Sequence, residues 1–201
     1  MTESTFNPDE LFSLASPEGL EAPLASPVYH PSSLQFLESI HRRKSDALKE
    51  IVLKQGWPDN KSYDGHAEAA AFMIVQHADY DLEFQELCHK YMLGGVKLGC
   101  TSPGFLAFLT DRILCNQGKH QRFGTQIREV TNGCFVPKPI ENPDTVDALR
   151  REVGLTESLS DYFLRVNNGD LLLYRPLLNG YAEELEMRRE HKIIEFPGNP
   201  H

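Results

Sequence analysis

The chain has 201 residues, a formal charge of −9 and 24% charged residues, a composition typical of a soluble globular protein. The negative charge argues against nucleic acid and against an anionic membrane surface as the main partner, because basic surfaces recognise both. No run of residues has the length and apolar character of a membrane span. The four cysteines are widely spaced without a CxxC pair, and no N-terminal signal is present, so we expect free thiols and a cytoplasmic location.

The two ends of the chain differ in composition from its middle. Residues 1–29 carry five acidic side chains, four prolines and no basic residue, which predicts a loosely ordered acidic arm. Residues 30–168 are predicted to form the core domain, and residues 169–201 a C-terminal extension with a charged helix at 181–191. A homodimer or a protein partner bound through these extensions is one interpretation that the sequence leaves open.

Helical spacing of apolar residues predicts three helices in the first half of the core, at about 33–55, 66–78 and 81–93. The basic run His41 to Lys44 in the first of these is interpreted as a solvated face. Asp81 can begin the third helix, and Gly94-Gly95 and Gly99 are expected to end it.

Ser102-Pro103 predicts the start of a fourth helix, about 103–117, with Ser as N-cap and Pro in the first turn. The Asn132-Gly133 dipeptide between two β-like segments predicts a hairpin. Two further helices are expected at about 143–153 and 157–166. The predicted fold class is therefore mainly α: a compact bundle of five to six helices with one small β-hairpin, plus N- and C-terminal extensions.

The second predicted helix, within the segment AEAAAFMIVQHAD, is apolar all round and ends in polar residues. We expect it to be the buried central helix, with His77 on the inward face beside Ala70, Met73 and Ile74. Gln76, His77 and Asp79 would then bring polar groups into the interior, where they need partners. His77 can act there as an acid/base group or as a hydrogen-bonded core residue.

A metal site at His77-x-Asp79 is the less favoured interpretation. Two residues apart on a helix, these side chains diverge by about 200°. His66 would lie about 16 Å from His77, too far to share one ion. We therefore expect neither a metal nor another cofactor.

Asp111 and Arg112 lie in the middle of the fourth predicted helix. Arg is rarely buried unless it is paired, so one interpretation is a salt bridge between helices. The other is a clamp in which Arg112 binds a carboxylate, phosphate or carbonyl of a substrate.

The run Gln121-Arg122-Phe123-Gly124-Thr125-Gln126 is the densest polar segment between two predicted elements. Gly124 permits a tight or left-handed backbone, while Thr125 and Gln126 offer neutral hydrogen-bonding groups. A rigid polar loop of this kind can bind a substrate or can cap nearby backbone groups, and the sequence leaves both open.

These blocks occur in a characteristic order: GWP at 56–58, VQHAD at 75–79, LTDR at 109–112 and QRFGTQ at 121–126. Single residues that belong to the same pattern are Gln85, Asn116, Gly118, Pro139 to Glu141, Asp147, Arg150 or Arg151, and Val153 to Leu155. With them the chain resembles the bacterial family catalogued as domain of unknown function 6624, over about residues 35–165. The resemblance implies one mainly helical domain and groups the polar blocks together, but implies no reaction. Phe123 stands where the family pattern has Tyr, so no hydroxyl is present there.

Two functions fit this pattern. The first is a small enzyme that acts on a polar or carbonyl-bearing small molecule by cofactor-independent hydrolysis, cyclisation or isomerisation. His77, Asp79 and Asp111 would be catalytic, and the substrate would be bound by Gln76, Arg112, Gln121, Arg122, Thr125 and Gln126. The second is a non-catalytic ligand-binding or protein-interaction module, whose polar cluster is a structural network. The sequence decides neither the substrate nor whether catalysis occurs.

Overall fold

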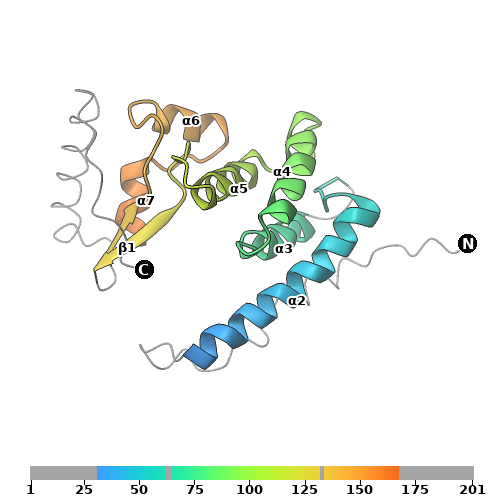
Figure 1. The fold of residues 1–201 in the computed structure, drawn as a ribbon. Coiled ribbons are helices and arrows are strands. Elements are labelled where there is room, and N and C mark those ends of the chain that lie inside the picture. The colour runs from blue at the N-terminus through green and yellow to red at the C-terminus, as the bar shows by residue number, and fades with distance from the viewer. Residues whose placement is uncertain (1–30, 62–64, 132–133, 168–201) are drawn as a thin grey trace, which may run out of the picture. The chain divides into compact units, whose positions relative to one another are not determined.

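The computed structural model describes residues 31–61, 65–131 and 134–167 (Figure 1). These residues form six helices and one two-stranded antiparallel sheet, which confirms the predicted fold class, mainly α with a small β-hairpin. None of the described helices is long and apolar enough to cross a membrane. The contacts divide the chain into a first unit that ends at Lys119 and a second unit that begins at His120. The predicted terminal extensions and the helix at 181–191 lie outside the described residues, and the predicted domain limits stay predictions.

The described part of the first unit contains four helices. They are α2 (Pro31–Gln55), α3 (Gly65–Val75), α4 (Leu82–Lys97) and α5 (Pro103–Asn116). α2 packs against α3, α3 contacts α4, and α4 packs along α5. The largest core side chains that are fully buried in this unit are Phe84, Leu48, Met92, Leu109, Val52 and Val75.

α2 buries a stripe in which every fourth residue faces inward. The stripe consists of Ile40, Lys44, Leu48 and Val52. Lys44 is thus only 9% exposed, in a position where the pattern calls for an apolar side chain. The interpretation of His41 to Lys44 as a solvated face was therefore wrong for Lys44, although Arg42 and Arg43 are exposed.

α3 is shorter than predicted, and this changes the surroundings of His77. The helix ends at Val75, after which the backbone tightens, with His77 N donating to Ile74 O (3.2 Å) and Ala78 N to Val75 O (3.1 Å). Ala70 and Ile74 are buried as predicted, but Met73 and the His77 side chain, which were expected on the same face, are exposed. The expectation of an inward-facing His77 was wrong because the helix that would have placed it ends two residues earlier.

α4 begins as predicted and ends later than predicted. Asp81 is its N-cap, with the carboxylate accepting a hydrogen bond from Phe84 N (3.0 Å). The helix continues through Gly94 and Gly95 to Lys97, so the expected stop at the glycine pair was wrong, whereas Gly99, also expected to end the helix, follows it with a positive φ of 67°. Gly95 is held by the following loop, because Cys100 N donates to Gly95 O (2.9 Å).

α5 begins where the sequence predicted. Ser102 is the N-cap, its hydroxyl accepts a hydrogen bond from Phe105 N (3.4 Å), and Pro103 occupies the first turn. Gly118 adopts a positive φ of 70° just after the helix, as expected of a residue that ends it.

The second unit contains the hairpin and two short helices. β1 (Ile127–Thr131) pairs antiparallel with β2 (Cys134–Pro137), and α6 (Val146–Glu152) and α7 (Leu159–Val166) follow. Asn167, just after α7, binds the backbone of Phe135 through both its amide oxygen and its amide nitrogen (2.7 and 3.0 Å). This side chain therefore joins the end of α7 to β2.

Candidate functional site

Asp79 is the centre of a hydrogen-bond network in the first unit. It lies in the turn between α3 and α4, and Arg112 of α5 binds it side-on, with Nε to Oδ1 at 2.7 Å and Nη2 to Oδ2 at 2.6 Å. A paired fork of this kind fixes both the position and the orientation of the guanidinium. The side chains are 24% exposed for Arg112 and 46% for Asp79, so water weakens the Coulomb attraction between them.

Two amide side chains complete the network. Asn116 Nδ2 donates to Asp79 Oδ1 at 2.8 Å, and Gln85 Nε2 donates to the same oxygen at 3.2 Å. Gln85 is fully buried, and its amide also contacts Val75 O (3.2 Å) and Asn116 Nδ2 (3.3 Å). The network therefore connects the end of α3 with α4 and α5.

The pKa of the Asp79 carboxyl is lowered from its ordinary value. Partial burial acts in the opposite direction and raises it, but the hydrogen bonds from Arg112, Asn116 and Gln85 and the charge of Arg112 outweigh burial. Asp79 is thus ionised at neutral pH and committed to its donors. It can charge-balance a neighbouring group, but it is poorly suited to accept or deliver a proton.

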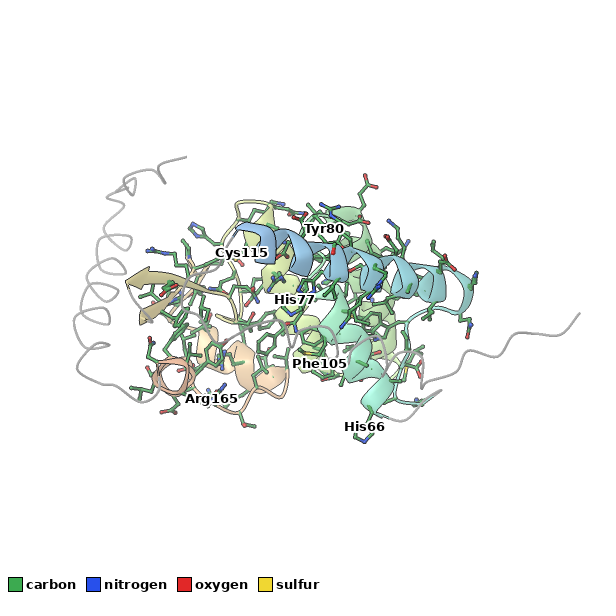
Figure 2. The ribbon with its side chains drawn as sticks, turned by 90° about the horizontal axis from the view of Figure 1, so that it is seen from below. His66, His77, Tyr80, Phe105, Cys115 and Arg165 are labelled. Atoms are coloured by element: carbon green, nitrogen blue, oxygen red, sulfur yellow. The ribbon has the colours of Figure 1, made fainter. Side chains whose placement is uncertain are left out.

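The His77 imidazole lies beside this network and against His41 of α2. The two ring centroids are 4.7 Å apart, with the planes tilted by 31°. Figure 2 shows His77 beside α2, whereas His66 lies at the opposite end of α3. His77 is exposed, and its ring makes no hydrogen bond within the described residues. Neither ring nitrogen of His77 is therefore occupied by a hydrogen bond within the described residues.

The pKa of His77 is lowered to about 4. Partial desolvation of the ring is the first cause, and the nearby His41, Arg112 and Lys44 add to it, while Asp79 acts in the opposite direction. Solvent reaches part of the ring, which limits the free-energy consequence of this shift. At neutral pH His77 is a neutral imidazole with one donor and one acceptor nitrogen.

His41 and Lys44 respond to the same surroundings. The pKa of His41 is lowered, first by burial and then by the positive charges of Lys44 and Arg112. Burial also lowers the pKa of Lys44, with a contribution from Arg43. We call His41, Lys44, His77 and Arg112 the cationic cluster, because each carries or can accept a positive charge. On a chain with net charge −9, it is a local concentration of groups that favour an anion.

The other residues predicted for this site in the first unit are placed differently. Asp111 is fully buried in α5, whereas Arg112 beside it reaches Asp79. Gln76 is half-buried after the end of α3, where its amide approaches the sulfur of the exposed Met73 (3.0 Å). No three His, Cys, Asp or Glu side chains in the described ranges are grouped so that they could hold a metal ion.

Gln121 of the second unit uses its side-chain amide to hold backbone. Its Nε2 donates to Gln126 O (2.9 Å) and Lys138 O (2.7 Å), and its Oε1 accepts from Gln126 N (2.8 Å). The side chain is fully buried. Both amide hydrogens are thus occupied, which leaves Gln121 without a donor for a substrate and supports the interpretation of this loop as a structural one.

The remaining polar residues of this loop are partly engaged as well. The Thr125 hydroxyl is buried and accepts from Gln126 Nε2 (3.1 Å). Arg122 is exposed and lies 3.6 Å from the Glu141 carboxylate. These residues are in the second unit and His77 is in the first, so their predicted convergence on one pocket stays a prediction.

Arg150 holds the same loop from α6. It is 2% exposed, its Nη1 donates to Phe123 O (2.9 Å), and its Nε donates to Glu157 O (3.0 Å). Gly124 has φ of 67°, and a Cβ there would collide with Leu159. The glycine in QRFGTQ is therefore required by backbone conformation and by close packing.

A family model described as a family of unknown function (DUF6624) matches residues 27–171. The chain belongs to this family. No curated protein and no solved structure matches it. In this DUF6624 chain, the VQHAD and LTDR blocks and the single residues Gln85 and Asn116 all contribute to the Asp79 network. Asn116 is 37 residues from Asp79 in sequence. The resemblance thus grouped residues that the fold of the first unit brings together.

Sequence reasoning missed His41 and Lys44 as members of the site. The sequence did contain an indication for Lys44, because this charged residue lies midway between Ile40 and Leu48 in an otherwise apolar stripe. A charged residue in such a position needs an explanation, and a neighbouring site is one. His41 carried no comparable signal, because only the fold places its ring against His77.

Proposed function

We propose that this protein is a small enzyme that acts on a polar or carbonyl-bearing small molecule by acid/base chemistry, with His77 transferring the proton. The observation that supports it best is an exposed imidazole with no hydrogen-bond partner among the described residues, placed within a cluster of positive charges. A histidine kept only for structure would be expected to be enclosed and hydrogen-bonded.

The neighbouring groups have complementary roles in this proposal. Arg112 is oriented by Asp79 before any substrate arrives, so it can stabilise a carboxylate or a developing oxyanion without further ordering. A negative charge bound here would also raise the pKa of His77 towards the range in which it can accept a proton. Substrate binding and proton uptake would therefore be coupled. Hydrolysis, cyclisation and isomerisation are the reaction classes that fit.

The alternative is a non-catalytic ligand-binding or interaction module, and one observation favours it for part of the site. Asp79, Gln85 and Asn116 bind one another, and Gln85 is fully buried. These three side chains behave as a structural network. The two functions therefore differ in what they require of His77 and agree on the role of the Asp79 network.

A metabolite screen by thermal shift, followed by product analysis of each stabilising compound, tests the proposal. His77→Ala should stay folded and lose turnover of the identified substrate, since the exposed ring contributes little to packing. His66→Ala is the matched control, because His66 is also exposed and lies at the other end of α3, away from the cluster. Ligand binding without turnover would favour the binding module, and an unfolded His77→Ala would favour a structural role.

We also propose a reducing compartment, the cytoplasm, with a small molecule as the principal partner. Cys88, Cys100 and Cys115 are free, which is in keeping with such a compartment. The acidic charge of the chain supports the exclusion of nucleic acid as a partner.

A further inference from the structure

A pocket of about 540 Å³ opens in the first unit between the end of α2 and the last turns of α4. Its lining includes none of the four residues of the cationic cluster. The volume lies in the range of small-molecule sites, roughly 300–1,000 Å³. The pocket is therefore a second candidate site, separate from His77.

The walls of the pocket are largely apolar. Trp57 is 7% exposed and forms a fixed wall, whereas Tyr91 and Leu98 are 41% and 71% exposed. Large apolar side chains left open to water around a cavity are typical of a ligand site. The walls thus suit a ring-sized apolar body.

Gly94 also lines the pocket, and packing does not explain this glycine. Within a helix a glycine costs about 1 kcal/mol relative to Ala. At the neighbouring Gly95 that cost has a reason, because a Cβ there would collide with Thr101. At Gly94 a Cβ would meet nothing within 4 Å. Gly94 is thus a lining position at which a larger side chain is not blocked by neighbouring protein atoms at its Cβ.

Two polar groups indicate the chemistry of the ligand. Thr101 lines the pocket, is 5% exposed, and its buried hydroxyl makes no hydrogen bond within the part of the chain that is described. The Lys90 ammonium, also in the lining, has no ion-pair partner in that part. Asp59, the acidic member of the lining, already accepts a hydrogen bond from Lys61 N (3.0 Å). We propose that this pocket binds a small molecule with an aromatic ring and a carboxylate, the carboxylate bound by Lys90.

Trp57 is the only tryptophan of the chain, so its fluorescence reports on this pocket. The probe is 3-phenylpropionate, which does not absorb where Trp is excited, and its neutral amide is the comparison. We expect 3-phenylpropionate to cause a saturable change in Trp57 emission. The amide should bind about tenfold more weakly, because it lacks the charge-assisted contact with Lys90. Lys90→Gln should abolish this preference.

Gly94→Leu tests the pocket without threatening the fold, since Leu is a better helix former than Gly and meets no neighbour at Cβ. It should weaken binding at least about tenfold by filling the cavity. Lys97→Leu places the same side chain on an exposed position of α4 outside the lining and should bind as the wild type does. The proposal is overturned if no saturable change occurs up to about 10 mM, if the amide binds as well as the carboxylate, or if Gly94→Leu binds normally.

Discussion

The Asp79 network and the QRFGTQ loop are both built from polar residues of the family pattern, but their side chains bind different partners. In the loop, Gln121 and Arg150 bind backbone carbonyls and are almost fully buried. In the network, side chains bind side chains, and an exposed imidazole lies at its edge. A buried polar side chain that binds backbone fixes a conformation, whereas an exposed imidazole beside an oriented guanidinium can do chemistry. The two regions therefore predict different responses to mutation.

Arg150→Met should give the largest loss of stability. It removes the donors to Phe123 O and Glu157 O from a buried position and leaves those carbonyls without these hydrogen bonds. We expect a loss of about 3 kcal/mol in the second unit, measured by hydrogen exchange of the β1 and β2 amides. Arg151→Met, at the exposed neighbouring position, should change stability by less than about 0.5 kcal/mol. Equal effects of the two substitutions would contradict the structural role of Arg150.

Gln85→Leu should have the largest effect among the side chains of the Asp79 network. It keeps the volume but removes the hydrogen bonds to Asp79 and Val75 O from a fully buried position. We expect the free energy of unfolding of the first unit to fall by about 2 kcal/mol, measured by Trp57 fluorescence during unfolding in urea. Glu86→Leu at the exposed next position is the control, and it should unfold close to the wild-type urea concentration.

Asp79→Asn should cost less, about 1 kcal/mol at pH 7, because the pair with Arg112 is partly exposed. The folded-state pKa of Asp79 is lowered, so its contribution is present above the unfolded value near 4 and is lost as the pH falls through the folded value. The difference between wild type and Asp79→Asn should therefore shrink below about pH 4. Asp46→Asn, an exposed carboxylate of α2, should show little difference at either pH.

His77→Ala should have the smallest effect on stability at pH 7, less than about 0.5 kcal/mol. Its effect should appear on acidification. The folded-state pKa of His77 is lowered, so below about pH 6.5 the unfolded chain binds a proton that the folded chain does not, and wild-type stability falls until the pH nears 4. His77→Ala should lose less stability over this window. A variant that is as acid-sensitive as the wild type would show that His77 is not shifted.

The sequence predicted those elements whose ends are set by local chemistry. Ser102-Pro103 began α5 because a hydroxyl cap and a proline act within one turn, and Asn132-Gly133 predicted the hairpin for a similar reason. The end of α4 was predicted wrongly because the glycine pair was interpreted as a helix stop, whereas Gly95 is a helical position at which a Cβ would collide with Thr101. No local pattern reveals such a tertiary neighbour.

The sequence identified His77, Asp79 and Arg112 as members of one site, and all three lie in the first unit. A salt bridge between helices was one of two interpretations of Arg112, but its partner Asp79 was not identified from the sequence. His77 was expected to be buried and is exposed. Its exposure follows from α3 ending at Val75, and helix ends are set partly by tertiary contacts. His41 could not be inferred, because its contact with His77 joins two helices.

The most direct test of the central claim is an NMR titration of the His77 ring in the intact chain, with His77→Gln used to assign its signals. Because the His77 ring is partly desolvated and lies within the cationic cluster, it should remain neutral as the pH falls below 6.5 and should begin to bind a proton only near its lowered pKa of about 4. A midpoint at or above 6.5 would contradict this, because it would mean that partial burial and the neighbouring His41, Arg112 and Lys44 do not act on His77 as the structure places them.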